Sequence, residues 1–288
     1  MATTDWTGDA ADGDWGNNGN WSGDKPASGD TARFLDGALS VTTGLDQSAV
    51  NLANLIIGPG YSGNIGLSGS YLKIGCDDLY VNGGGILYIE PGTAAIDEVR
   101  VLATEQTTGL TLKSSVQTAL WVWAGIVNYV FDTAADDLDL YVLGSAADVT
   151  ITDSAAGDLN TLLVEAGAVE LDMDASDFPA TVDVRGGTLT VTSAANSPTT
   201  VNVWGGSVVW NKAAAASAFN VHSGGTLDFS QEETAKTPTT VTLYGTGILK
   251  LNNGCRNIIP GNIYVYGDAA PTPIHLDKGM YVDVIAAA

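Results

Sequence analysis

The sequence predicts an all-β fold, a right-handed parallel β-helix (β-solenoid) with a tryptophan-rich cap at its N-terminus. Short apolar strands alternate with glycine-containing bends, a pattern typical of stacked coils. The bends recur at a nearly constant interval, and four of their glycines lie 19 residues apart: Gly167, Gly186, Gly205 and Gly224. Corners of small residues separate the units, and three of the corners contain a proline that presets φ: Pro179, Pro198 and Pro238.

Residues 1–37 form the predicted cap and docking segment, and residues 38–288 the predicted solenoid with a C-terminal cap. The open end of a solenoid exposes an unpaired strand edge and an apolar tube, which large side chains must cover. Five residues are candidates for this cover: Trp6, Trp15, Trp21, Phe34 and Leu35. The alternative is a calcium loop, but its candidate ligands miss the spacing of such a loop: Asp9, Asp12, Asp14 and Asn17.

The strands of the solenoid follow in two halves. Less regular strand pairs come first, at 71–92, 99–116, 120–131 and 138–154. Regular units follow, at 164–173, 182–191, 201–210, 219–229 and 241–251. No linker or block of charge marks a second domain, so one domain is the simplest prediction.

Alternation along each strand predicts which side chains face the core. In the unit 182–191 the inward set is Val182, Val184, Leu189 and Val191, and the outward set is Asp183, Arg185 and Thr190. A sandwich or propeller built from hairpins is the alternative, in which the paired glycines would close antiparallel strands. The constant spacing favours stacked coils.

The charge of the chain excludes several partners. The chain has 11 Lys and Arg residues and 33 Asp and Glu residues, which gives a net charge of -22. Nucleic acid and anionic membranes would be repelled at long range, so neither is an expected partner. No run of about 20 apolar residues predicts a membrane span. The N-terminus has no basic and apolar leader, which predicts a chain that stays in the cytoplasm where it is made.

The segment from Trp15 to Phe34 carries a motif that resembles the opening rung ahead of autotransporter-type and related bacterial β-helix repeats. The resemblance covers about a tenth of the chain and implies the start of a β-helix, without implying an activity. Those relatives are exported passenger domains. The residues that carry it are Trp15, Asn20, Trp21, Ser22, Gly23, Pro26, Gly29, Asp30, Ala32 and Phe34.

Residues suited to catalysis are sparse. Cys76 and Cys255 are too far apart for a local CxxC site, and we expect plain thiols. His222 and His275 lie in different segments, and no nucleophile or nucleotide motif accompanies them. The lysine and arginine residues form no cluster with acidic residues like that of pectate-type lyases. A glycosidase would need two carboxylates, for which the adjacent pairs Asp77–Asp78 and Asp136–Asp137 are the candidates. We therefore expect no enzymatic activity, cofactor or metal.

Tryptophans in the strands are candidates for a surface site. Alternation requires some of them to point outward, where they would form a subunit interface or bind sugar, and the interface is favoured. The four are Trp121, Trp123, Trp204 and Trp210.

The functional expectation is a virion structural protein assembled in the host cytoplasm: a phage capsid decoration, or cement, protein. It would form a homotrimer and bind the major capsid protein or other virion proteins. The basis is analogy at the level of the fold. The alternatives are a bacterial cell-surface adhesin or S-layer-like module, and a glycan-degrading tailspike domain.

Overall fold

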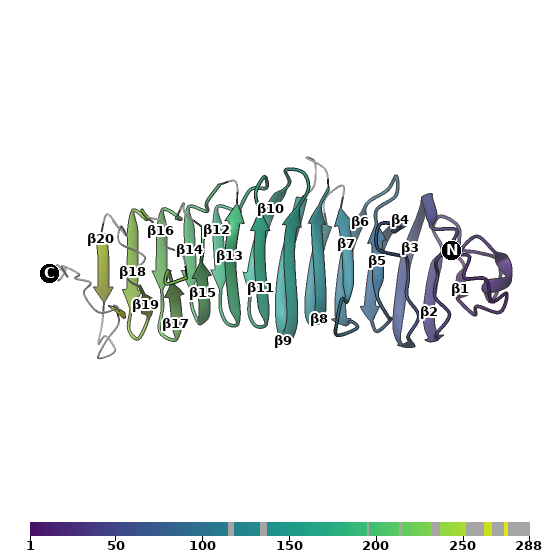
Figure 1. Cartoon of the computed structure of the whole chain (residues 1–288), viewed down its shortest axis with the longest axis horizontal. Coiled ribbons are helices and arrows are strands. Elements are labelled where there is room, and N and C mark those ends of the chain that lie inside the picture. The colour runs from purple at the N-terminus through teal and green to yellow at the C-terminus, as the bar shows by residue number, and fades with distance from the viewer. Residues whose placement is uncertain are drawn as a thin grey trace. The chain divides into compact units, whose positions relative to one another are not determined.

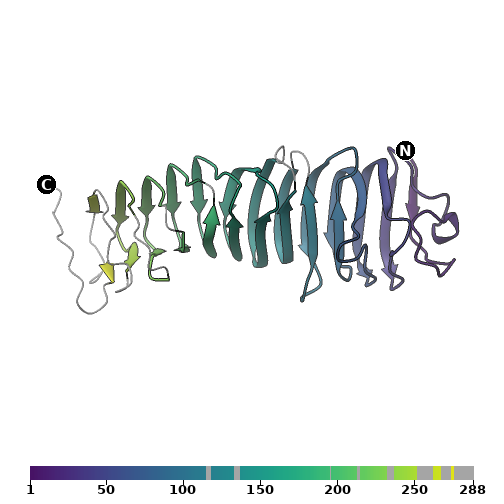
Figure 2. The same cartoon turned by 45° about the horizontal axis from the view of Figure 1, so that its top comes forward.

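The computed structural model describes residues 1–114, 118–132, 137–194, 196–212, 215–231, 237–251, 262–266 and 274–275. These residues form a parallel β-solenoid, as predicted, and Figures 1 and 2 show its strands as successive rungs. The chain divides into two compact units, Met1–Asp139 with Ala146–Gly157 and Leu140–Ser145 with Asp158–Ala288. The boundary expected at residue 37 stays a prediction. Among the described residues, no helix is both long enough and apolar enough to span a membrane.

The first unit begins with β1 and one short 3-10 helix, η1, and continues through long strands. Every strand pairing recorded within it is parallel, from β1 with β2 to β7 with β8. The strand β9 contributes residues to both units. The elements are β1 Thr3–Asp5, η1 Asn18–Asn20, β2 Thr31–Gly37, β3 Asp46–Tyr61, β4 Leu72–Asn82, β5 Leu87–Glu90, β6 Ile96–Ala103, β7 Leu110–Ser114, β8 Thr118–Phe131 and β9 Asp137–Asp153.

The second unit is the regular part of the repeat. From β10 onward, even-numbered strands pair with even-numbered strands and odd with odd, always in parallel, so each rung contributes one strand to each series. Its strands are β10 Asp158–Val164, β11 Ala168–Met173, β12 Thr181–Val184, β13 Thr188–Ala194, β14 Thr200–Val203, β15 Gly206–Trp210, β16 Ala218–Val221, β17 Gly225–Asp228, β18 Thr240–Tyr244, β19 Ile248–Lys250, β20 Asn262–Tyr266 and β21 Ile274–His275.

The register between strands of successive rungs explains the repeat that the glycine spacing predicts. Val182 lies opposite Val201, and Leu189 lies opposite Val208, so apolar residues pile on apolar residues along the coil. The predicted inward set is confirmed, because all four of its members are fully buried: Val182, Val184, Leu189 and Val191. The hairpin alternative is wrong, because the strands on either side of each glycine pair bond to neighbouring rungs in parallel.

In two bends, the glycine with positive φ lies one residue after the glycine that marks the 19-residue spacing in the sequence. The glycines with positive φ in the first bends are Gly167, Gly187 and Gly206, at 75°, 67° and 68°. The amide of Ser207 donates to the carbonyl of Gly187 at 2.9 Å, which sets these bends directly on one another. The second residue takes the left-handed conformation, which side chains disfavour, in the pairs Gly186–Gly187 and Gly205–Gly206, whereas the first residue takes it in Gly224–Gly225, at 87°.

The corner prolines occupy one position of the rung. Pro179, Pro198 and Pro238 are buried, and each lies two residues before a residue of one register column, which runs through β12, β14, β16 and β18. The rung of β16 has Ala216 at this place, also fully buried. The Ala216 amide donates no hydrogen bond to the described residues.

Replacing Ala216 by proline is therefore expected to stabilise the protein. Proline restricts the unfolded chain, and a compatible site gains about 0.4–1 kcal/mol. Urea unfolding of the full chain measures the gain. The control is Ala218→Pro, because the Ala218 amide donates to the Thr199 carbonyl at 2.9 Å and its loss should destabilise. Equal destabilisation by both variants would contradict the prediction.

Candidate functional site

The N-terminal tryptophans form one aromatic cluster with Phe34. Trp6, Trp15 and Trp21 are buried, and their ring centroids lie 5.5, 5.7 and 5.6 Å from that of Phe34. Tyr61 adds a fifth ring at 5.0 Å from Phe34, and burial raises the pKa of its hydroxyl. The edge-to-face and tilted arrangements are those that aromatic pairs prefer.

Hydrogen bonds hold two of the indoles in place. The indole N–H of Trp6 donates to the Leu39 carbonyl at 3.2 Å, and that of Trp21 donates to the Trp15 carbonyl at 2.9 Å. Leu35 instead points outward and is 42% exposed. The side chain of Leu35 therefore takes no part in the buried cluster, because it follows Phe34 in a strand and faces the opposite side.

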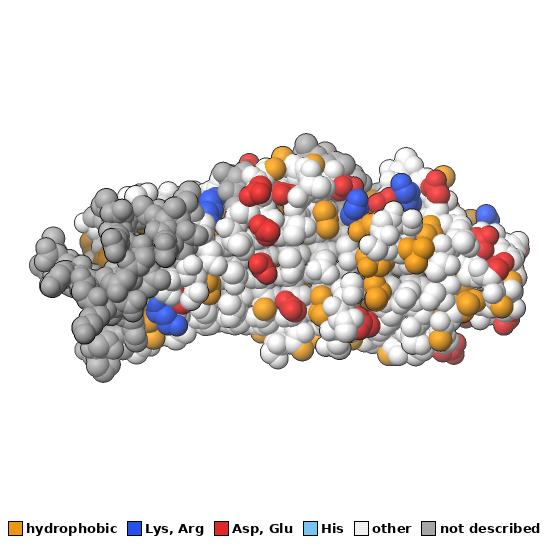
Figure 3. Space-filling model, viewed as in Figure 1, with side chains coloured by type: hydrophobic (Ala, Val, Ile, Leu, Met, Phe, Trp, Pro, Cys, Tyr) orange, Lys and Arg blue, Asp and Glu red, His pale blue; other side chains and the backbone are white. Residues whose placement is uncertain are grey.

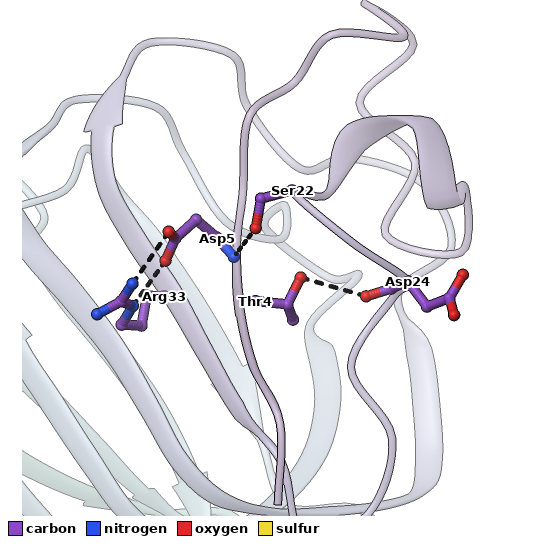
Figure 4. Close-up of polar contacts among 5 residues, drawn as sticks. All are labelled: Thr4, Asp5, Ser22, Asp24 and Arg33. Carbon is purple, nitrogen blue, oxygen red and sulfur yellow. Dashed lines mark hydrogen bonds and ion pairs between the residues drawn. The ribbon is translucent and has the colours of Figure 1, made fainter.

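Polar contacts join the start of the chain to β2 (Figure 4). The guanidinium of Arg33 donates to both carboxylate oxygens of Asp5, at 2.6 and 3.0 Å. The backbone amide of Asp5 donates to Ser22 Oγ at 2.9 Å, and Thr4 Oγ1 donates to the Asp24 carbonyl at 3.2 Å. Hydrogen bonds thus connect β1 to the segment that resembles an opening rung, through Ser22 and Asp24 on one side and through Arg33 on the other.

The strand tryptophans separate into three kinds. Trp210 is fully buried, between Phe178 at 6.0 Å and Phe219 at 5.3 Å, so it is a core residue and not a surface one. Trp121 and Trp123 are half-buried. Trp204 is 48% exposed.

Trp204 begins a row of stacked rings along the outer side of the second unit. Its ring lies 3.7 Å from that of His222, at an interplanar angle of 9°. His222 lies 4.7 Å from Tyr244, and Tyr244 lies 5.6 Å from Tyr266. Tyr244 and Tyr266 are also exposed. Each ring follows directly after the last inward residue of β14, β16, β18 or β20, which places all four in one column.

A second column of polar side chains runs beside the rings. The side-chain amide of Asn202 donates to Asp183 Oδ1 at 2.9 Å, and that of Asn220 donates to Asn202 Oδ1 at 2.9 Å. The indole N–H of Trp204 reaches the same oxygen of Asp183 at 3.5 Å. Thr242 and Tyr264 continue this column in β18 and β20.

Of the described residues weighed for chemistry, His222 is the one that lies in these columns, between the rings of Trp204 and Tyr244. The carboxylate of Asp78 pairs with Arg100 at 3.2 Å, whereas Asp77 is exposed. Asp136, Cys255 and the side chain of His275 lie outside the described residues. Burial raises the pKa of the Cys76 thiol, so it stays protonated. In the described part of the chain, no three His, Cys, Asp or Glu side chains are placed to hold a metal ion.

The ring row was not predicted from the sequence beyond Trp204. Its signal was present in the repeat, because VNVW, FNVH, VTLY and IYVY all end on an aromatic residue. Comparisons of the chain with models of protein families, with curated proteins and with solved structures find no match.

Proposed function

We propose that the protein is a non-enzymatic structural protein that acts by association. The observation that carries the proposal is the exposed row of Trp204, Tyr244 and Tyr266, joined through His222. Tryptophan and tyrosine are enriched in the buried centres of protein interfaces. Stacked on a solenoid, these rings are already held in place, so association orders few side chains.

The specific form of the proposal is a phage capsid decoration protein, present as a homotrimer on the assembled shell. Two features support it: an all-β fold with a regular core, and a net charge of -22 that keeps a strand-rich surface soluble. Its warrant is analogy of fold. The protein would stabilise the shell by binding the assembled form of the major capsid protein.

The test is the composition of virus particles. Particles are purified on a density gradient from cells that carry the gene, and their proteins are quantified by mass spectrometry. We expect this chain in the intact particles at a copy number comparable to that of the major capsid protein. Its absence from the particles, with the chain present in the cell lysate, would contradict the proposal.

A further inference from the structure

Among the described residues, no charged side chain lies on the outer side of β14, β16, β18 and β20, in a chain with 33 acidic residues. We call this surface the neutral face. The middle of the neutral face is the polar column, which consists of Asn202, Asn220, Thr242 and Tyr264. Its margin is the ring row, which consists of Trp204, His222, Tyr244 and Tyr266. Its outward residues, all at least partly exposed except the buried Thr242, are Thr200, Asn202, Trp204, Ala218, Asn220, His222, Thr240, Thr242, Tyr244, Asn262, Tyr264 and Tyr266.

The charged outward side chains of this series of strands end at β12, the strand before the neutral face. The preceding strand, β12, has Asp183 in the same column as Asn202, and the next residue outward is Arg185, which pairs with Glu165 at 3.3 Å. Beyond them the charged residues in the described part of the chain are Lys212, which follows β15, Asp228 in β17 and Lys250 in β19, so none belongs to the neutral face. Burial also lowers the pKa of His222, which keeps the imidazole neutral at pH 7. Figure 3 shows, by contrast, acidic side chains spread over the middle of the face in view.

We propose that the neutral face is the surface on which copies of this chain associate, around a three-fold axis parallel to the stacking direction of the second unit. The inference rests on the proposed function and gives its homotrimer an interface. In such an arrangement a residue near the axis meets its own copies at the same height. A carboxylate there would meet two further carboxylates, and like charges brought together cost several kcal/mol. Neutral columns avoid this repulsion.

The ring row favours a protein over a sugar as the occupant. His222 and Tyr244 have ring neighbours on both faces, so these two rings present edges, an imidazole nitrogen and a hydroxyl to the outside. A sugar would need a free aromatic face, whereas the positive edges suit rings of another copy. A neutral glycan would not be repelled by carboxylates, whereas a like-charged copy of this chain would be, so the absence of charge favours a copy as the occupant.

The experiment is the mass of the full chain by light scattering after size exclusion, over a series of concentrations. We expect the wild type at three times the 29.6 kDa of one chain. Tyr244→Glu should raise the concentration of half-dissociation by roughly tenfold or more. The matched control is Leu102→Glu, since Leu102 is 46% exposed, follows an inward valine of β6 in the same manner, and lies in the first unit. This variant should stay trimeric.

Circular dichroism and thermal unfolding establish that each variant is folded. Asn220→Asp, which changes charge with little change in shape, serves as a second variant and should also dissociate. If both variants fold and remain trimers, the neutral face is not the interface, while the proposed homotrimer stands. A wild type that is monomeric at every concentration overturns the inference and the homotrimer together. Binding of cellohexaose by the monomer, detected by tryptophan fluorescence and lost in Trp204→Ala, would assign the face to a glycan instead.

Discussion

Replacing Phe34 by alanine is expected to lower the free energy of unfolding by about 3–5 kcal/mol. Phe34 is fully buried and contacts Trp6, Trp15, Trp21 and Tyr61. Removing the central ring leaves a cavity, and the indoles of Trp6 and Trp21 would have to give up their hydrogen bonds to move into it. Urea unfolding, followed by tryptophan fluorescence, measures the loss.

The adjacent residue supplies the control. Leu35→Ala removes an apolar side chain from the same strand, but Leu35 points to solvent, so the change should stay within about 0.5 kcal/mol. Hydrogen exchange should locate the effect of Phe34→Ala in β1 and β2. A loss in Phe34→Ala no larger than that in Leu35→Ala would contradict the role of the cluster in holding the first rungs.

The sequence predicts the interior of this fold better than its surface. Inward positions follow from alternation and from the bend spacing, and Val182 to Val191 lie as expected. The 19-residue spacing alone does not say which glycine of a pair takes the left-handed conformation, because either member of Gly186–Gly187 could supply it. In the structure the second member stacks on Gly167, since the amide of Thr188 donates to the Gly167 carbonyl at 2.8 Å and Ala168 lies opposite Thr188.

The surface depends on register, which one strand alone cannot give. Trp204 was recognised by its residue type, whereas His222 read by itself suggests only an isolated histidine. Once Val203 is set opposite Val221, and Val221 opposite Leu243, the residues after them must lie in one column. Trp210 shows the opposite error. Its residue type made it a candidate for the surface, whereas its position in β15 places it in the core.

The second large effect is expected from Gly206→Ala, which should cost about 2–5 kcal/mol of folding free energy through two separate causes. A side chain disfavours the φ of 68° that Gly206 adopts. In addition, a Cβ there would press on the Gly187 carbonyl oxygen and lie 2.7 Å from the carbonyl carbon of Gly186, which are backbone atoms of the rung below.

Gly224→Ala separates the two causes of the loss in Gly206→Ala, since Gly224 has a φ of 87° but no atom within 4 Å of the added Cβ. We expect it to cost only about 1–2 kcal/mol. Equal losses for the two variants in urea unfolding would mean that rung contact adds nothing, and the close stacking of these bends would not be what holds neighbouring rungs in register.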